Sequence, residues 1–466
     1  MLVFWVKPYC AKVSARTVSL AFGPQHPAAH GILRLNCLLQ GETVRYLDCV
    51  FGLLHRGTEK LIEQRSYLQS LPYFDRFDYV ANLQQEHAFC LAIEGGVSTP
   101  SYLSFQVLAL RTLFDETSRV LNHLLTLSAV SLDMGAMGPI FWAFEEREVL
   151  MSLLEQASGA RMHTGLYRPF EVELSGVTSL FFRELAFFLS RVVRSLGGAF
   201  CGLVGGRAIR TRLSLVGQLS RHRCVSYGIS GLLARSAGLL VDWRLSPSTP
   251  YGLYPVIRFS SYLGKRGDNF DRFLLRIRET VESFQVLSQV LSQLAPSLPT
   301  VGYLRTFGAQ ARRVYARGVL THAGYVTPGL VTTVACITRV CLGSVSNSVW
   351  SKLGGTAVAV TRLGVSGVSP ITQRYLSMEA VISHFKGVSA GVISAPGITL
   401  GCVESPKGVV GVLLVSGGGL KPHRVKLRTP VSHNMNMLAS MAVGTLLGDF
   451  VMTFCSFDIV LGEIDR

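Results

Sequence analysis

The segments FGPQHPAAHG (Phe22 to Gly31), FGLLHRGTEKLIE (Phe51 to Glu63) and LPYFDRFDYVAN (Leu71 to Asn82) carry the densest chemistry in the sequence. Histidines, arginines and tyrosines gather there among glycines and prolines. A purely structural segment does not need so many titratable and hydrogen-bonding side chains. We therefore expect the functional site to lie within residues 22–82 and the rest of the chain to support it.

The composition points to a chain whose surface is largely covered. Charged residues make up 16% of its 466 residues, and the mean hydropathy is +0.35. A surface so short of charge either enters a membrane or is buried against partner proteins. The longest uncharged run, Gly318 to Thr338, contains His322 and Pro328. These residues favour a packed core segment over a spanning helix.

The net charge of +16 does not indicate nucleic-acid binding. It comes from 45 basic and 29 acidic residues, and the basic residues are scattered without a run of five. No nucleic-acid motif accompanies them.

The cysteines do not form a ligand set. There are ten, without a CxxC pair, and the two nearest in sequence are Cys336 and Cys341. Iron–sulfur clusters need grouped thiolates, and disulfide frameworks belong to smaller secreted chains. A GxGxxG motif after a strand is also absent, so we expect no flavin or nucleotide site. The sequence thus predicts that this chain ligates no metal or cofactor itself.

The periodicity predicts an α+β fold with a small N-terminal β unit, a central bundle of long helices and a C-terminal β-rich part. Two strands flank a turn at Gly41 and Glu42, and Thr58 is a candidate helix N-cap. The GAMGP sequence at 135–139 interrupts the helical pattern. Apolar spacing of three and four predicts helices over 77–128, 140–157, 181–196 and 271–294. Residues 398–430, with glycine and proline turns, predict three or four strands.

Nine blocks of this chain, in order, resemble the 49-kDa core-subunit family of NADH:ubiquinone oxidoreductase, respiratory complex I. That family is related to the large subunit of nickel–iron hydrogenases. The blocks are Phe22–Glu94, Arg119–Leu125, Leu132–Met137, Phe141–Glu148, Ser158–His163, Tyr227–Gly231, Arg266–Arg272, Glu404–Gly408 and Asp458–Arg466. Agreement is weak over 197–224, and Val241-Asp242-Trp243-Arg244 replaces the family's usual Trp-Asp-Leu-Arg.

The resemblance also suggests a division of the chain. Residues 1–62 hold an extension and the β unit with the quinone-site loop, and 63–295 form the helical core. Residues 296–375, rich in Gly, Val, Ser and Thr, are a lineage-specific insertion, and 376–466 form the C-terminal part. The first 22 residues carry Lys7, Lys12 and Arg16 and no acid, which fits a mitochondrial presequence or an N-terminal strand.

The resemblance implies that His30 and Tyr79 bind the headgroup of ubiquinone, with His26 in the same loop. A quinone carbonyl becomes basic on reduction, which suits an imidazole that exchanges protons near neutrality and a neutral phenol donor. Other interpretations remain open. His26 and His30, four apart, could bind metal or be structural, although Pro24 and Pro27 disfavour a helix. Tyr79 could be a core aromatic residue, and the residues alone do not distinguish it from Tyr73.

Three further positions follow from the resemblance. Asp133 matches a carboxylate that pairs with the quinone-site histidine, although it could simply cap a helix. Arg76 and His163 match positions beside a 4Fe–4S cluster held by a partner subunit, and Arg56 has a similar role. Arg76 could instead pair with Asp75 or Asp78.

The implied protein is a core peripheral-arm subunit of mitochondrial complex I on the matrix side of the inner membrane, active as NADH:ubiquinone reductase within the complex. Its partners are the small subunit with the terminal cluster, the 30-kDa-type subunit and the membrane-arm subunit at the quinone entrance. A catalytically idle scaffold and a hydrogenase-like enzyme are the alternatives. The cysteine-free tail DIVLGEIDR argues against the hydrogenase, which needs two CxxC pairs.

Overall fold

The computed structural model describes residues 17–22, 33–96, 103–173, 177–246, 251–294 and 391–466, with single positions at 378, 382, 385 and 389. The predicted insertion at 296–375 and the loop with His26 and His30 lie outside these described residues. The uncharged run at 318–338 lies outside them as well. These interpretations therefore stay predictions, as does the division of the chain at 62, 295 and 375.

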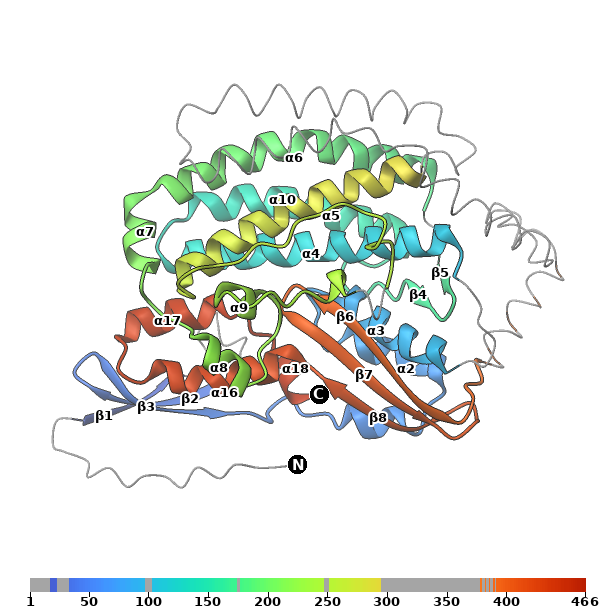
Figure 1. The fold of residues 1–466 in the computed structure, drawn as a ribbon, viewed down its shortest axis with the longest axis horizontal. Helices are drawn as coiled ribbons and strands as arrows, with labels where there is room; N and C mark the ends of the chain where they lie inside the picture. The colour runs from blue at the N-terminus through green and yellow to red at the C-terminus, as the bar shows by residue number, and fades with distance from the viewer. Residues whose placement is uncertain are drawn as a thin grey trace.

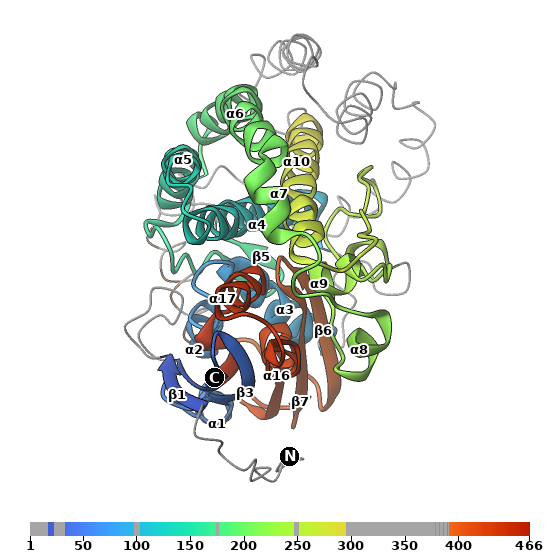
Figure 2. The ribbon, with the colours of Figure 1, turned by 90° about the vertical axis from the view of Figure 1, so that its left-hand side faces the viewer.

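Long helices form one layer of the molecule, and two three-stranded sheets with shorter helices form the other (Figure 1). The view turned by 90° shows the same layering, with α5, α6 and α10 farthest from the sheets (Figure 2). The long helices are α4 Phe105–Asp133, α5 Gly138–Ser158, α6 Ser179–Gly205 and α10 Asn269–Leu294. This mixture of helices and strands agrees with the α+β class; the hydrogenase-like arrangement stays a prediction.

The helical pattern is divided more finely than the sequence predicted. The helical pattern expected over 77–128 belongs to two helices, α3 Asn82–Gly95 and α4. The break predicted at 135–139 is confirmed: α4 ends where Gly135 adopts a φ of 83°, and Ala136 N donates to Ser131 O at 2.9 Å. Glycine reaches this left-handed conformation without strain, and the bond back to the last turn closes the helix.

Short elements connect the two layers. They are α1 Thr58–Ile62, α2 Tyr67–Asp75, β4 Tyr167–Arg168, β5 Glu171–Val172, α7 Arg207–Leu213, α8 Arg221–Ser226, α9 Gly231–Ser236 and the 3-10 turn η2 Trp243–Leu245. Thr58 was expected to cap α1, but it is the first helical residue. Gly57 occupies the cap position without a side-chain bond.

The N-terminal sheet is built from β1 Thr17–Phe22, β2 Arg34–Gln40 and β3 Thr43–Val50, all antiparallel. The predicted turn is confirmed, with Gly41 at φ 62°. The sheet shares a core with the C-terminal helices α16 Pro430–Ala442 and α17 Leu447–Ser456. Backbone bonds join β3 to the link between those helices, with Val44 N donating to Thr445 O at 2.9 Å. The two ends of the described chain thus fold against each other.

Helix α6 is, among the described residues, the one helix long and apolar enough to cross a membrane. Its inner face packs on α5 and α10, and Phe188 lies 6.3 Å from Phe284 of α10, between ring centroids. Core helices of globular proteins have the same composition. We therefore assign no membrane topology from α6.

The C-terminal sheet follows the order β6 Gly397–Ser405, β7 Gly408–Ser416 and β8 Pro422–Arg428, and α18 Leu461–Asp465 ends the chain. Strand β6 packs directly on α3: Thr399 Oγ1 donates to Ala92 O at 2.6 Å. A Cβ on Gly401 would lie 2.1 Å from Ala88 O and 2.6 Å from Ala92 N. Since both neighbours are backbone atoms, no side chain can move aside.

We expect Gly401→Ala to lower the free energy of unfolding by about 1–3 kcal/mol or more, as overpacking does. Gly411→Ala is the matched control on β7, because its Cβ would meet Arg428 Cβ and Cys402 Sγ at an ordinary 3.6 Å. Thermal unfolding of the two variants checks this. Equal melting temperatures would show that α3 and β6 can separate at no cost.

Candidate functional site

Tyr79 lies in the loop between α2 and α3, and the Asp78 carboxylate shapes this loop. Asp78 Oδ1 accepts hydrogen bonds from Val80 N at 3.1 Å and Ala81 N at 3.3 Å. Both Asp78 oxygens also accept from Lys407 Nζ, at 2.8 and 2.7 Å, and both charged side chains are buried. A salt bridge between the β6–β7 turn and the α2–α3 loop therefore fixes the backbone that carries Tyr79.

The C-terminal tail packs against the other side of the α2–α3 loop. Gly462 of α18 packs so closely on it that an added Cβ would lie 2.5 Å from Phe77 O. Asp465 accepts hydrogen bonds from Gly52 N at 2.9 Å and Leu54 N at 2.8 Å. The segments 51–57, 76–81 and 458–466 therefore meet around Tyr79, although they are far apart in sequence.

The half-buried phenol of Tyr79 faces a charged interior. Burial raises the pKa of Tyr79, and the negative charges of Asp78 and Asp458 add to this shift while Lys407 opposes it. The phenol is therefore held in its neutral form and keeps its O–H group.

Two acids of the tail, Asp458 and Glu463, complete the charge cluster around Lys407. Burial alone would raise the pKa of Asp458, but Lys407 and Arg276 outweigh it, and the net shift is downward. Glu463 differs: burial, together with Asp78 and Asp458, raises its pKa to about 8. Its Oε1 accepts from Gln85 Nε2, and its Oε2 is buried without a hydrogen-bond partner among the described residues. The cluster thus contains one carboxyl group that is protonated at neutral pH.

Asp133 is the last residue of α4 and bonds to the thiol of Cys455 on α17. Burial raises the pKa of Cys455, and Asp133 and Asp458 raise it further, so the thiol stays protonated and acts as donor. Asp458 acts electrostatically on both Tyr79 and Cys455. Asp458 therefore links Tyr79 electrostatically to the hydrogen-bonded pair of Cys455 and Asp133. The terminal position of Asp133 in α4 also fits the alternative interpretation as a helix-end residue.

His26 and His30 lie outside the described residues, but the strands on either side of their loop are described. Phe22 of β1 pairs with Leu35 of β2, and Arg34 of β2 pairs with Val50 of β3. The described residues on either side of 23–32 therefore lie at the end of the sheet from which segment 51–57 runs to the C-terminal tail.

Arg56, Arg76 and His163 form an exposed cationic edge beside this site. Arg56 Nη2 donates to Arg76 O at 3.2 Å, and both Arg76 and His163 lower the pKa of the nearby Asp75 against the larger effect of burial. Asp78 binds Lys407, and Arg76 Nη1 donates to Pro72 O at 2.8 Å. Among the described residues no group of His, Cys, Asp or Glu could hold a metal ion.

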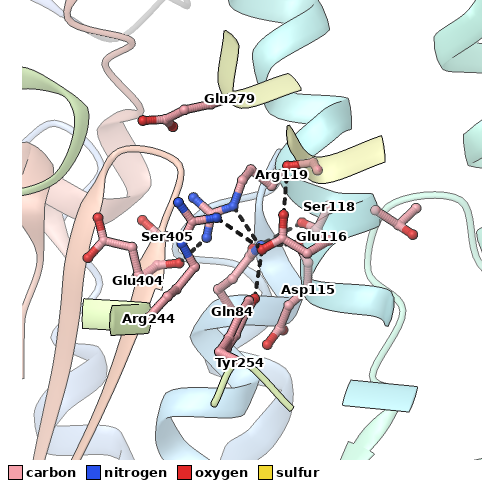
Figure 3. A network of polar contacts seen from close by, with 12 residues as sticks. Gln84, Asp115, Glu116, Ser118, Arg119, Arg244, Tyr254, Glu279, Glu404 and Ser405 are labelled. Atoms are coloured by element: carbon pink, nitrogen blue, oxygen red, sulfur yellow. Dashed lines mark hydrogen bonds and ion pairs between the residues drawn. The ribbon is translucent and has the colours of Figure 1, made fainter. Parts of the chain in front are cut away.

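A second buried network holds the helical layer against the sheet layer. In Figure 3, Arg119, Arg244 and Tyr254 converge on Glu116, with Tyr254 Oη donating to Glu116 Oε1 at 2.7 Å. Arg235 bonds Glu279 Oε1 at 2.9 Å and Glu404 Oε1 at 2.8 Å. Glu404 is on β6, so the network joins α4, α9 and α10 to the strand that ends beside Lys407.

The sequence departure at 241–244 leaves this network intact. Arg244 Nη2 donates to Asp242 Oδ2 at 2.8 Å, and Arg244 Nη1 to Glu116 Oε1 at 3.3 Å. The departure keeps the aspartate and arginine at the second and fourth positions of the motif. The charged residues of the motif are therefore the same as in the usual Trp-Asp-Leu-Arg, and only the apolar residues beside them differ.

Sequence reasoning missed the residues that hold the site together. Lys407, Asp458, Glu463 and Asp465 were noted only as parts of the blocks ESPKG and DIVLGEIDR, and Cys455 was not singled out. One signal in the sequence could have found them, because a charged residue among apolar neighbours needs a partner when it is buried. Lys407 stands between two apolar strand segments, and the acids of the tail alternate with apolar residues.

Comparison with known proteins identifies the class. The family model of the respiratory-chain NADH dehydrogenase 49 kDa subunit matches residues 133–466.

Relatives match over the whole length. The NADH-ubiquinone oxidoreductase 49 kDa subunit of Paramecium tetraurelia is 38% identical, covering 97% of this chain and 100% of the relative. The 49 kDa subunit of Acanthamoeba castellanii is 35% identical, over 99% of each chain. That of Prototheca wickerhamii is also 35% identical, over 97% of each chain. The chain belongs to the 49 kDa subunit family of the respiratory-chain NADH dehydrogenase.

We expect Lys407→Met to lower the free energy of unfolding by about 3–5 kcal/mol, because it leaves Asp78 buried without a counter-charge. Lys426→Met is the control: its ion pair with Glu59 is long, 3.5 Å, and exposed, and is worth at most about 1 kcal/mol. The double variant Asp78→Asn with Lys407→Met should recover part of the loss. Urea unfolding measures all three, and equal losses in the two single variants would contradict the assignment.

Glu463 should make stability depend on pH. Its pKa in the folded chain is about 8, above the ordinary 4.5, so its contribution is complete below 4.5 and lost as pH rises through 8. The slope for one proton is at most about 1.4 kcal/mol per pH unit. Glu463→Gln cannot ionise, so its unfolding free energy should fall less over this window. Parallel curves for wild type and variant would refute the shift.

Proposed function

We propose that this chain is a core subunit of mitochondrial complex I and forms the ubiquinone-reduction site with a neighbouring iron–sulfur subunit. The supporting observation is the position of Tyr79, held as a neutral donor where segments 51–57, 76–81 and 458–466 meet. Membership of the 49 kDa family along the whole chain agrees with this role. The relatives named above are subunits of ubiquinone oxidoreductases, and we extend that substrate to this chain.

Tyr79 and His30 orient the quinone headgroup in this proposal, with His26 nearby. The phenol donates to one carbonyl oxygen and places no fixed charge in the site. The imidazole donates to the other oxygen and can give up a proton as that oxygen becomes basic. Phe22, Leu35 and Val50 lie at the same end of the N-terminal sheet, which is consistent with the segment of His26 and His30 and the Tyr79 loop forming one site.

In this proposal Asp133 responds to the change in protonation of His30. A carboxylate favours the imidazolium form of a histidine, so loss of that proton alters the charge that Asp133 must balance. The Cys455 thiol already donates to Asp133, and Asp458 couples that group electrostatically to Tyr79. Quinone chemistry at Tyr79 therefore has a route to the end of α4, from which we propose it is coupled to proton translocation.

The cationic edge of Arg56, Arg76 and His163 faces the partner's 4Fe–4S cluster in this proposal. The cluster supplies single electrons to the quinone. Positive side chains near a cluster stabilise its reduced form and raise its potential. Because both arginines and His163 are exposed in the isolated chain, a partner can approach them directly.

Partners and location follow from the same role. We propose contacts with the small subunit that carries the terminal cluster, the 30-kDa-type subunit and the membrane-arm subunit at the quinone entrance. The chain then belongs to the peripheral arm on the matrix side of the mitochondrial inner membrane. A charge-poor surface with exposed Met137, Phe141 and Trp142 at the start of α5 suits burial against other subunits.

Tyr79→Phe tests the proposal within the assembled complex. Loss of one hydrogen bond to a group that gains charge costs about 1.5–3 kcal/mol, so quinone reduction should fall roughly 10- to 100-fold. Tyr73→Phe, six positions earlier in the same block, is the control and should retain activity. Steady-state NADH:ubiquinone reductase assays on purified complex, with subunit composition checked, give the rates.

The outcomes separate the alternatives. Unchanged quinone reduction in Tyr79→Phe would favour an idle scaffold. Bound nickel found by elemental analysis would favour the hydrogenase-like enzyme.

A further inference from the structure

An exposed row of arginines lies on helices α7 and α8 and on the segment that joins them. Figure 1 shows this segment, residues 207–223, running from α7 to α8 along the left side of the molecule. Five of its arginines are exposed to solvent, and we call them the arginine strip: Arg207, Arg210, Arg212, Arg221 and Arg223. His222 is also exposed and adds positive charge when it is protonated. The strip is therefore a strongly basic part of the surface.

The sequence around the strip supplies no acid to neutralise it. No aspartate or glutamate occurs between Glu184 and Asp242. Asp268 reaches the backbone of the strip from another part of the chain, but its side chain is buried. Its two carboxylate oxygens accept hydrogen bonds from Leu215 N at 3.0 Å and Asp271 N at 2.8 Å. Both oxygens are thus engaged by backbone donors rather than by arginines.

One acid on a neighbouring helix does reach a strip arginine. Asp449 Oδ1 of α17 lies 3.8 Å from Arg212 Nη1, and the arginine side chain is more than half exposed. An ion pair so long and so exposed to water is weak. Arg221 Nε donates to Ala237 O at 3.2 Å, which leaves its charge unbalanced. The other three strip arginines have no ion pair with any described residue.

The rest of the chain cannot supply the missing negative charge either. The segments outside the described residues contain one acid in total, Glu379, and twelve lysines or arginines. A second copy of the chain would bring the same net charge of +16, and like charges repel. A partner that neutralises the strip must therefore be a different molecule with an excess of acid.

The side chains of the strip indicate which kind of acid it binds. All five cations are arginine, and no lysine occurs between Lys60 and Lys265. The planar guanidinium presents paired N–H donors that match the two oxygens of a carboxylate, and it is less strongly hydrated than an ammonium group. Leu215 and Val225, within and beside the strip, are 65% and 70% exposed. Arginines around exposed apolar side chains are typical of protein interfaces.

A membrane or a nucleic acid fits this surface less well. Helices α7 and α8 have seven and six residues, and Leu215 and Val225 are the large exposed apolar side chains of this part. A helix that lies in a membrane interface buries a continuous apolar face instead. Single-stranded nucleic acids stack on aromatic side chains, and no Phe, Trp or Tyr occurs between Phe200 and Tyr227.

We propose that the arginine strip binds an acidic segment of another subunit of the complex. Aspartate and glutamate carboxylates of that segment pair with the guanidinium groups, and its apolar side chains cover Leu215 and Val225. The proposal rests on membership of a family of complex subunits, and it does not depend on the quinone site. Agreement with the family is weak over residues 197–224, which suits a contact whose details differ between relatives.

Carbodiimide cross-linking of the purified complex tests the proposal, because this reagent joins a lysine amine to a carboxylate in direct contact. Arg210→Lys on α7 and Arg223→Lys on α8 keep the positive charge and add the amine. We expect each variant to become joined to an Asp or Glu of a different subunit, which mass spectrometry of the digested complex identifies. The wild type is the matched control, since residues 207–223 then contain no lysine and cannot react.

Arg212→Lys verifies the reaction, because its amine should become joined to Asp449 of the same chain. If this link forms while Arg210→Lys and Arg223→Lys give no link to another subunit, the proposal is overturned.

Charge reversal gives a second readout that does not rely on cross-linking. Arg210→Glu should lower the salt concentration at which one subunit leaves the complex, followed by native gels and mass spectrometry. Arg258→Glu, which alters an exposed arginine outside the strip, is the control and should leave that salt concentration unchanged. Retention of every subunit at the wild-type salt concentration would contradict the proposal. So would loss of bound phospholipid phosphate in place of a subunit, because an anionic lipid would then occupy the strip.

The two kinds of variant cover each other. If Arg210→Glu does not assemble, the lysine variants keep the charge and still decide. Both readouts concern contact between subunits, whereas Tyr79→Phe concerns quinone turnover, so either proposal can fail without the other.

Discussion

The pairing of buried charges with opposite charges organises much of this protein. Lys407 is shielded from water and is neutralised by Asp78, with Asp458 and Glu463 nearby. Arg235 is likewise buried and bonds Glu279 and Glu404. Each of these pairs joins elements distant in sequence, because removing one partner leaves a charge in an apolar interior at high cost. The two networks meet along β6 and its turn, so the helical layer, the C-terminal sheet and the Tyr79 loop hold one another in register.

This arrangement gives the site its chemical character. Two cations, Lys407 and Arg276, face the three acids Asp78, Asp458 and Glu463, which leaves one acid in excess, and burial raises the pKa of Glu463 to about 8. On the α2 and α3 side of the same loop, the buried Asp75 and Glu86 both accept a hydrogen bond from Gly165 N, and burial raises the pKa of both acids. In the proposed quinone site, acids with raised pKa values beside Tyr79 can balance added charge by short proton movements without large shifts of the backbone.

The sequence predicted the local structure well where the signal was local. The turn at Gly41, the break at Gly135 and the C-terminal strands were all indicated by glycine and by apolar spacing. The division of the helical pattern expected over 77–128 was not placed, although Gly95, Gly96 and Pro100 stand between the end of α3 and the start of α4. The site was less predictable. Tyr79 and Asp133 could be named by resemblance, but the contacts of Lys407, Cys455 and Glu463 depend on the tertiary fold, for which sequence spacing carries no signal.

The packing of the C-terminal tail on segment 51–57 sets the order in which these parts of the chain can fold. Gly52 and Asp465, which bond each other, are 413 positions apart, and Arg56 N donates to Arg466 O at 3.3 Å. During translation segment 51–57 must wait, unanchored, until residues 458–466 have been made. Nascent chains and products truncated before residue 458 therefore share one defect: segment 51–57 lacks the partner on which it packs. Quality control that recognises this exposed stretch would reject both without any need to assay turnover.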